Sequence, residues 1–324
     1  MAAPAPTLLP APLPAPSTAT AALWMAGWLA ALVVMTVAGR EATHELAVFQ
    51  IMELRSVIGL LLLYPLVHRS GGLAAMRTQR LRQHIGRNTA HYAAQFGWFV
   101  ALTLIPLAQL VAIEFTMPIW TALLAVIVLG ERMGRWKTIA VALGLVGVTI
   151  IVRPQTGAVE PGQLIALLAA VGFAVSVIMV KALTRTESTV AIIFWMLVVQ
   201  SVLGLFPALH VWRWPSLHVW PWVLVIAFCG TFSHFCMARA MRYADATVVV
   251  PMDFLRVPLT ALAGWWVYAE GIGAFTVFGA ALILTGNLLN LKGTAAPKGG
   301  QGADGLPGPP APQAPAPATP RQAT

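Results

Sequence analysis

Two charged side chains interrupt one of the most apolar stretches of the sequence, at a spacing that permits an ion pair. Asp253 and Arg256 lie in "VVVPMDFLRVPLTAL" (residues 248–262), whose other members are Val, Pro, Met, Phe, Leu, Thr and Ala. Residues three apart share a helix face, and an unpaired ion in lipid costs roughly 3 to more than 10 kcal/mol, so we expect a salt bridge. Pro251 and Pro258 would free backbone carbonyls beside it. The pair either borders a polar binding path or only fixes helix packing.

Three further ions lie in other apolar stretches. Glu53 and Arg55 in "FQIMELRSVIG" are two residues apart, so they point about 200° from each other on a helix and each needs another partner. Charge balance suggests one pair between Arg55 and Glu114 and another between Glu53 and Arg256. Glu114 and Asp253 each lie about 11 Å into helices that run in opposite directions. We therefore expect one carboxylate nearer each face, where the two could gate in turn or carry protons.

Polar and aromatic side chains at helical positions extend this candidate binding or gating site. The residues concerned are Gln95, Trp98, Trp120 and His234, together with His91, Tyr92 and Gln200. A lone polar group in a helix bundle also often hydrogen-bonds a neighbouring helix, so a structural role stays open for each of them.

No pattern of catalytic or metal-ligating residues accompanies these charges. Cys229, His234 and Cys236 match no metal-ligand spacing. The two cysteines would stand about 10 Å apart along one helix, too far for a disulfide, and are expected to be buried as small apolar groups. The sequence also lacks a phosphate loop, a dinucleotide fingerprint and an HExxH motif. We expect no cofactor, no metal and no enzymatic activity.

The composition places these residues in a membrane. Of 324 residues, 58% are hydrophobic and 10% charged, whereas soluble domains carry roughly 25% charged residues. The apolar runs are near 20 residues long, which indicates membrane-spanning helices and not the shorter strands of a barrel. We therefore predict an all-α integral membrane protein with ten transmembrane helices. The expected spans are 21–39, 46–67, 88–105, 107–129, 136–153, 161–181, 189–209, 219–240, 246–267 and 272–291.

The distribution of Lys and Arg predicts the orientation. With the N-terminus in the cytoplasm, fifteen cations fall in inner segments, including the loop 68–87, and only Arg40, Arg153 and Arg213 fall in outer loops. This asymmetry explains the net charge of +9, which we attribute to topology and to contact with anionic lipid headgroups. A nucleic-acid partner is not expected. Ala/Pro/Gly-rich tails at 1–20 and 293–324 are expected to be disordered, and no cleaved signal peptide is expected.

The chain also repeats itself. A shift of 139 residues places Glu114 on Asp253, a coincidence of acidic residues that apolar composition does not explain. Further coincidences are Glu131 with Glu270 and Phe115 with Phe254 at this shift, and Ser56 with Ser201 and Gly59 with Gly204 at a shift of 145. Two copies of five helices must enter the membrane from opposite sides, which gives an inverted repeat. The expected units are 21–153 and 161–291.

Glu131 and Glu270 each end a predicted helix beside a loop. A carboxylate at a helix C-terminus opposes the helix dipole, so we expect both residues to be structural. Their expected partners are nearby cations such as Arg132, Arg135 or Lys137.

Residues 106–154 and their echo at 243–291 resemble the two EamA repeats of the drug/metabolite transporter superfamily. The most specific segments are "LGERMG" (129–134) and "ADATVVVPMDFLR" (244–256); the second copy departs from the first in reading "YAEGIG" (268–273), without the basic residue after Glu270. The resemblance covers roughly residues 21–291. It implies ten helices, both termini in the cytoplasm and transport of small metabolites without ATP.

The expected function is secondary transport of a small organic metabolite or drug-like compound across the inner membrane by alternating access. A channel, a sensor or a membrane-embedded enzyme is the alternative, but such proteins usually show a pore-lining polar stripe, a soluble domain or a catalytic cluster. Membrane lipids and a small-molecule substrate are the expected partners, and a homodimer is compatible with the sequence. The substrate, its direction of movement and any coupling ion are not fixed by the residues.

Overall fold

The structure is a computed structural model that describes residues 17–129, 134–152, 159–183, 186–244, 249 and 252–295. These residues are helical apart from short connections. The helices are α1 (Thr18–Thr43), α2 (Val48–Arg69), η1 (Leu73–Met76), α3 (Leu81–Leu104), α4 (Leu107–Glu114), α5 (Met117–Leu129), α6 (Arg135–Val152), α7 (Pro161–Leu183), α8 (Thr189–His210), α9 (Trp220–Tyr243), α11 (Arg256–Tyr268) and α12 (Ala274–Ala295). With α4 and α5 taken as one crossing, they give the ten membrane segments predicted from the sequence.

Within the described part of the chain, six segments are long and apolar enough to cross a membrane by length and composition alone. They are Thr18–Thr43, Val48–Arg69, Leu107–Leu124, Pro161–Val180, Thr189–His210 and Trp220–Met237. Two shorter apolar helices, Thr138–Val152 and Ala274–Leu289, lie beside each other in α6 and α12. Large apolar side chains such as Leu168 and Phe206 are exposed on the outside of the bundle, as lipid contact requires. The chain is a multi-pass membrane protein.

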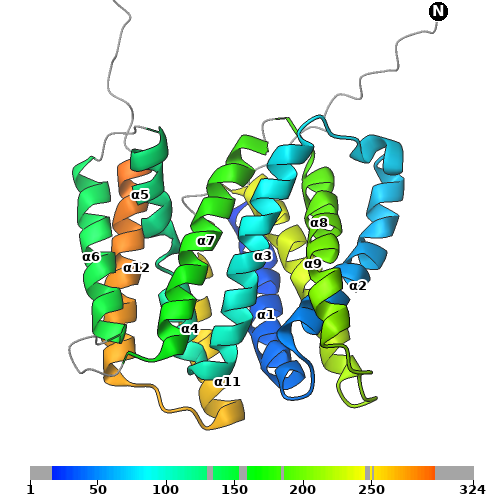
Figure 1. Ribbon diagram of the computed structural model, residues 1–324. Helices are drawn as coiled ribbons and strands as arrows, with labels where there is room; N and C mark the ends of the chain where they lie inside the picture. Colours follow the sequence, from blue (N-terminus) through cyan, green and yellow to red (C-terminus); the bar gives the residue numbers. More distant parts are fainter. Residues whose placement is uncertain are drawn as a thin grey trace, which may run out of the picture.

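The packing of the helices follows the internal repeat (Figure 1). In the two copies, α1 corresponds to α7 and α3 to α9. The contacts of α1 with α9 and of α3 with α7 are among the most extensive in the molecule, and they are equivalent under a two-fold rotation. Helices α2 and α8 pack on each other, as do α6 and α12, so each meets its own counterpart. Each repeat therefore packs mainly against the other one, as expected for an inverted pair.

One pair of counterparts approaches backbone to backbone. A Cβ atom added at Gly147 of α6 would lie 2.7 Å from the carbonyl oxygen of Gly279 on α12, and one added at Gly279 would lie 2.5 Å from that of Gly147. Only glycine permits this approach, because any side chain would force the helices apart. The α6–α12 pair forms one edge of the molecule in Figure 1, opposite α2 and α8.

Two helices predicted to be continuous are broken at equivalent positions. The expected span 107–129 ends as α4 at Glu114, turns at Phe115–Thr116 and resumes as α5, while the expected span 246–267 turns at Phe254–Leu255 before α11. Pro118 and Pro258 lie in the first turns after the breaks and lack the N–H that would bond four residues back. Each break divides a span that the sequence predicted as one crossing, and Pro258 was the sequence signal in the second of them.

Helix α3 begins earlier than predicted. The expected span 88–105 treated the preceding residues as part of the inner loop 68–87, but α3 starts at Leu81. His84, Arg87 and Asn88 are buried within it. The polar composition of this segment resembles a solvated loop, whereas these three polar residues are buried in the helix bundle.

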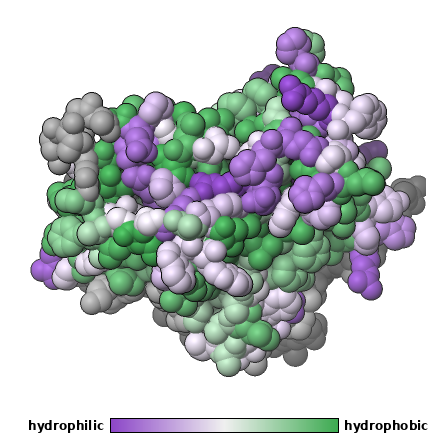
Figure 2. All heavy atoms as spheres, turned by 90° about the horizontal axis from the view of Figure 1, so that it is seen from below, coloured by the Kyte–Doolittle hydropathy of each residue, from purple (hydrophilic) through white to green (hydrophobic). Residues whose placement is uncertain are grey.

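The end of the molecule at the bottom of Figure 1, here the lower end, gathers the connections after α1, α3, α8 and α11. Figure 2 views this end and shows a band of hydrophilic residues crossing it, with hydrophobic residues on both sides. Glu45 accepts hydrogen bonds from the backbone N and the Oγ of Ser216, at 2.6 and 2.7 Å, and links the α1–α2 and α8–α9 connections. These bonds from Ser216 hold the pKa of the exposed Glu45 carboxyl below its usual range.

Candidate functional site

Arg256 joins two carboxylates that the sequence predicted at different depths. Its Nη1 lies 2.9 Å from Oε1 of Glu114, and its Nε lies 3.6 Å from Oδ1 of Asp253. The predicted proximity of Asp253 and Arg256 is therefore confirmed, but the shorter contact is with Glu114 on α4. Because both carboxylates contact one guanidinium group, the expectation that each lies nearer a different face was wrong.

Aromatic residues surround this ionic cluster. The indole N–H of Trp28 donates to Oδ1 of Asp253 at 2.7 Å, and that of Trp98 donates to Oε2 of Glu114 at 2.8 Å. The guanidinium carbon of Arg256 lies 4.8 Å from the centroid of the Phe115 ring. We call Trp28, Trp98, Glu114, Asp253 and Arg256 the central cluster.

The helix breaks place the central cluster. Glu114 is the last residue of α4 and Arg256 the first residue of α11, so each ion opposes the dipole of its own helix. Their pairing puts the cation beside the negative end of α4 and the carboxylate beside the positive end of α11, which favours both. The side chain of Asn287 on α12 donates to the Phe115 carbonyl at 2.9 Å and satisfies backbone at the first break.

Arg55 has amide partners and no ion pair among the described residues. Its Nη2 donates to Oε1 of Gln95 at 2.8 Å and to Oε1 of Gln200 at 2.6 Å. Gln200 lies 145 residues after Arg55, so the two are counterparts in the repeat and meet across the two-fold relation. The suggested pair of Arg55 with Glu114 was wrong, because Glu114 is held by Arg256.

Glu53 is buried at 5% exposure, and its Oε2 has no hydrogen-bond partner. It approaches α8 at Gly204, where an added Cβ would lie 2.6 Å from Glu53 Oε2 and 2.9 Å from the Tyr92 hydroxyl. The suggested pair of Glu53 with Arg256 was wrong. The absence of a side chain at Gly204 makes room for both polar groups.

Of three further candidate residues, His234 and His91 lie beside the buried polar groups, whereas Trp120 does not. The ring of His234 lies 6.5 Å from that of Trp28, edge to face, which connects α9 to the central cluster. His91 approaches Oγ of Ser176 through Nδ1 at 3.4 Å. Trp120 instead makes a local hydrogen bond of 3.0 Å to Oγ1 of Thr116, within the break between α4 and α5.

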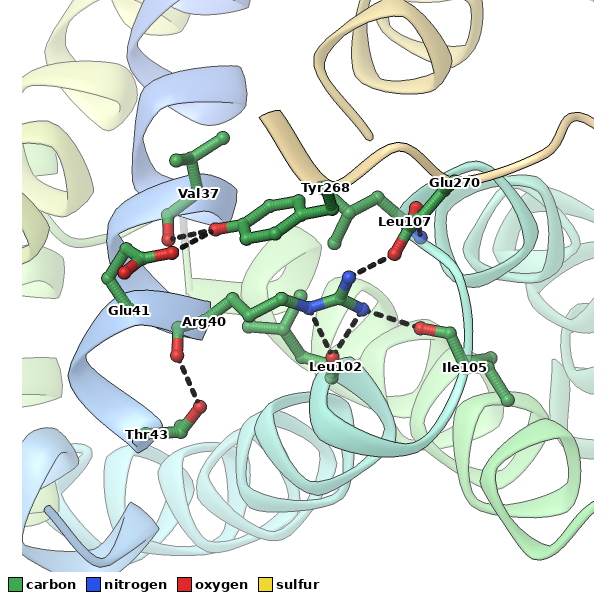
Figure 3. Close-up of polar contacts among 9 residues, drawn as sticks. All are labelled: Val37, Arg40, Glu41, Thr43, Leu102, Ile105, Leu107, Tyr268 and Glu270. Carbon is green, nitrogen blue, oxygen red and sulfur yellow. Dashed lines mark hydrogen bonds and ion pairs between the residues drawn. The ribbon is translucent and has the colours of Figure 1, made fainter. Parts of the chain in front are cut away.

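A second polar network lies at the lower end, where the sequence predicted only a loop cation (Figure 3). Arg40 is within α1 and pairs with Glu270, which follows α11. Its Nε donates to the Leu102 carbonyl at 2.9 Å, and its Nη2 donates to the carbonyls of Leu102 and Ile105, both at 2.6 Å. Arg40 therefore caps the C-terminus of α3. We call Arg40, Tyr268 and Glu270 with these carbonyls the lower-end network.

The backbone conformation at the end of α11 positions Glu270 in this network. Helix α11 ends with Ala269 in the left-handed region at a φ of 54°, and the N–H of Glu270 returns to the Gly264 carbonyl at 3.1 Å. The Glu270 carboxylate then accepts from the N–H of Leu107 at 2.8 Å. The expected partners of Glu270 were wrong, because its cation comes from Arg40. Glu131 lies outside the described residues.

Tyr268 completes the lower-end network. Its hydroxyl donates to the Glu41 carboxylate at 2.8 Å and lies 3.3 Å from the Val37 carbonyl, and Arg40 stacks 5.0 Å from its ring centroid. A pocket of about 440 Å³ opens beside the network. It is lined by Arg40, Thr43, His44, Thr103, Leu104, Ile105, Pro106 and Glu270.

Several residues of these networks escaped the sequence reasoning. Trp28 resembled one of many interface tryptophans, and Arg40 and Arg87 resembled loop cations. The only available signal was position: Arg87, His91, Gln95 and Trp98 recur at spacings of four, four and three, which places them on one helical face.

Comparison with known proteins identifies the family. The model of the EamA-like transporter family matches residues 19–153 and again 160–292. The chain belongs to the EamA-like transporter family. The two matches confirm the resemblance and the duplicated architecture, and the family is one of transporters and not of enzymes.

Curated relatives of this EamA-like chain carry different substrate names. A riboflavin transporter of Brucella anthropi is 31% identical over 72% of this chain and 84% of its own length. An S-adenosylmethionine uptake transporter of Rickettsia prowazekii is 26% identical over 67% of this chain and 74% of its own length. A pseudopaline exporter of Pseudomonas aeruginosa is 27% identical over 78% and 88% of the respective chains.

A solved crystal structure shares the fold. It covers 85% of this chain and 97% of its own, with a TM-score of 0.60 and 20% sequence identity. At that identity the likeness concerns the arrangement of helices alone.

Proposed function

We propose that this protein is a secondary transporter that moves a small organic metabolite by alternating access, with the two repeats rocking about the central cluster. The observation that carries the proposal is the contact of Arg256 with Glu114 and Asp253. It joins the two repeats at the breaks of two equivalent helices. Broken helices between inverted repeats are where secondary transporters hold substrates and coupling ions.

The proposed site consists of Glu53, Arg55, Glu114, Asp253 and Arg256, with Gln95, Trp98 and His234 around them. Buried ions that contact the other repeat can exchange a protein partner for a substrate group when the repeats move. Trp120 is retained in the proposal only as a support of the first helix break, because its hydrogen bond is local. The two units that would move are the repeats, at residues 21–153 and 161–291.

The substrates to be tested first come from the relatives. S-adenosylmethionine and riboflavin are both small metabolites with an aromatic ring system, and the central cluster presents the indoles of Trp28 and Trp98. Purified protein in proteoliposomes should accumulate at least one of the two above the level of protein-free vesicles. Both directions of an imposed gradient should be assayed, since related chains carry the names of uptake and export proteins. Failure with both compounds would contradict this choice of substrates.

We further propose that the protein lies in the inner membrane with both termini in the cytoplasm, because the cations of short loops favour that orientation. In a variant without Cys229 and Cys236, a cysteine at position 75 should react with a membrane-impermeant reagent only from the cytoplasmic side. A cysteine at position 215 should react from outside. Labelling of position 75 in intact cells would reverse the orientation.

A further inference from the structure

Two buried guanidinium groups lack a carboxylate partner among the described residues. Arg55 is 4% exposed and Arg87 is 7% exposed. Arg55 donates to the amide oxygens of Gln95 and Gln200, and Nη1 of Arg87 donates to Oδ1 of Asn88 at 2.5 Å. The Nε of each arginine is buried without a hydrogen-bond partner. Neutral amides are the hydrogen-bond acceptors of both cations, and among the described residues neither has a carboxylate within ion-pair distance.

None of the three carboxylates of this region forms an ion pair with Arg55 or Arg87 in the described part of the chain. Glu114 and Asp253 contact Arg256. Glu53 is close to Arg55 in sequence but approaches Gly204 on α8, and no ion pair within 4.0 Å joins it to an arginine of the described chain. Removing a charge from water without a partner is costly, so an uncompensated buried arginine marks a site that an external anion can fill.

The donors of this region converge along one face of α3. Arg87, His91 and Gln95 follow at intervals of four residues, and the face continues to Trp98, about 16 Å along the axis from Arg87. Gln95 on this face accepts a hydrogen bond from Arg55, and Arg87 lies about two turns earlier on the same face. The face therefore carries positive charge up to the edge of the central cluster.

Further buried donors in the same region have no acceptor. The Tyr92 hydroxyl on α3 and the Gln200 amide nitrogen on α8 have no hydrogen-bond partner in the structure. The side-chain oxygen of Gln200 accepts from Arg55, which leaves its nitrogen able to donate to another group. Unsatisfied donors beside two unpaired cations call for a group that only accepts hydrogen bonds, which is a carboxylate or a phosphate.

We propose that Arg55 and Arg87 form the anion-binding pole of the transport site, which receives a carboxylate or phosphate group of the substrate. This inference rests on the proposed function and adds a substrate class to it. The guanidinium of Arg55 is positioned by Gln95 and Gln200 from two other helices, so it is preorganised for the anion.

The opposite pole lies one helical turn away. Trp98 follows Gln95 by three residues and donates to Glu114, while Trp28 contacts both His234 and Asp253. This pole has two carboxylates for one arginine, so it carries excess negative charge beside aromatic rings and suits a cationic or aromatic part of the substrate. A site with these two poles fits a zwitterion whose anionic group enters beside Arg55.

The test uses compounds that differ by the anionic group alone. S-adenosylmethionine and its decarboxylated form differ by one carboxylate, and riboflavin 5′-phosphate differs from riboflavin by one phosphate. Apparent Kd values for all four are measured on the protein in lipid nanodiscs, with Arg55→Gln, Arg87→Gln and Arg55→Lys as variants. Arg82→Gln is the matched control, because Arg82 is an exposed cation on α3.

We expect the wild-type protein to bind the anionic member of at least one pair at least tenfold more tightly. Arg55→Gln and Arg87→Gln should remove that preference, with the affinity for the anionic member falling at least tenfold. An unfolding temperature close to that of the wild type shows that these variants are folded. Arg55→Lys should keep part of the preference, and Arg82→Gln should keep all of it. Equal binding of both members by the wild-type protein would overturn the inference and leave the proposed function standing. Binding of none of the four compounds would contradict both the inference and the choice of substrates made above.

Discussion

The central cluster and the lower-end network are both built on an arginine–glutamate pair that joins the two repeats, and their ions are equally buried. The side chains of Arg40 and Glu270 are 13% and 16% exposed, and those of Arg256 and Glu114 are 12% and 16% exposed. They differ in how completely the arginine is satisfied. Arg40 bonds two backbone carbonyls as well as its carboxylate, whereas Nε of Arg256 is buried without a hydrogen bond.

We propose from this difference that the two pairs have different roles. A guanidinium that is saturated by backbone groups of α3 holds the helix ends together and has nothing left to offer a ligand. A guanidinium with an unused donor, between two carboxylates that can release it, is able to exchange partners. Burial alone does not distinguish a structural ion pair from one in a binding site. The number of donors that already have acceptors does distinguish them.

The largest expected effect comes from Arg256→Gln. It leaves Glu114 and Asp253 without a cation, and removing one partner of a buried pair costs on the order of 3–5 kcal/mol. We expect transport per folded molecule to fall at least ~100-fold, which corresponds to about 2.7 kcal/mol, together with a lower unfolding temperature. Uptake in proteoliposomes and thermal unfolding in detergent measure the two. Unchanged transport would remove the central cluster from the mechanism.

A smaller loss of transport is expected from Asp253→Asn. The Asn side-chain oxygen can still accept from Trp28, and Glu114 still pairs with Arg256, so folded protein should remain in the membrane. Transport should nevertheless fall roughly tenfold, about 1.4 kcal/mol, because the negative charge of this pole decreases. If the pair is only structural, activity and stability should fall together, and the double variant Asp253→Asn plus Arg256→Gln should restore both.

Arg40→Gln tests the other side of the comparison. It removes the cap of α3 and leaves Glu270 without its cation, so the free energy of unfolding should decrease by about 3 kcal/mol. Transport per folded molecule should stay within about threefold of the wild type. Adding Glu270→Gln should cost little more, because the pair is already broken. A transport loss as large as that of Arg256→Gln would show that the lower-end network is also part of the transport cycle.

The smallest expected effect concerns the exposed link between Glu45 and Ser216. Because these hydrogen bonds lower the pKa of Glu45, its stabilising contribution is present above the pKa of the unfolded chain and is lost as the pH falls through the lower folded value. Glu45→Gln should flatten this part of the profile of unfolding temperature against acid pH and leave transport unchanged. A profile identical to that of the wild type would mean that the link contributes nothing.

The sequence predicted the features that depend on local composition and on the repeat. Apolar runs gave the ten crossings, and the coincidence of Glu114 with Asp253 pointed to equivalent sites. The spacing of Asp253 and Arg256 predicted that they lie close. These inferences succeed because a helix that crosses lipid must be apolar along its whole length, and because a charge within it is costly unless it is paired.

The partners themselves could not be predicted, since they depend on how helices far apart in sequence pack. Arg40 and Glu270 are separated by 230 positions, and nothing near either residue indicates the other. The burial of Arg87 was not predicted because the segment around it is as polar as a loop. The helix breaks had a readable signal in Pro118 and Pro258, but proline in membrane helices is common enough that the turns follow only from the tertiary structure.

The exchange of helices between the repeats bears on how the protein is made. While the ribosome is still synthesising the second half, α1 and α3 are already in the membrane, and their main packing partners α9 and α7 do not yet exist. The same holds for the ion pairs, because Arg40 and Glu114 have no partner until Glu270 and Arg256 have been synthesised. The helices of the first repeat are therefore an insertion intermediate and not a folded unit. In a chain that stops before α9, α1 lacks its native neighbour and is accessible to the quality-control proteases of the membrane.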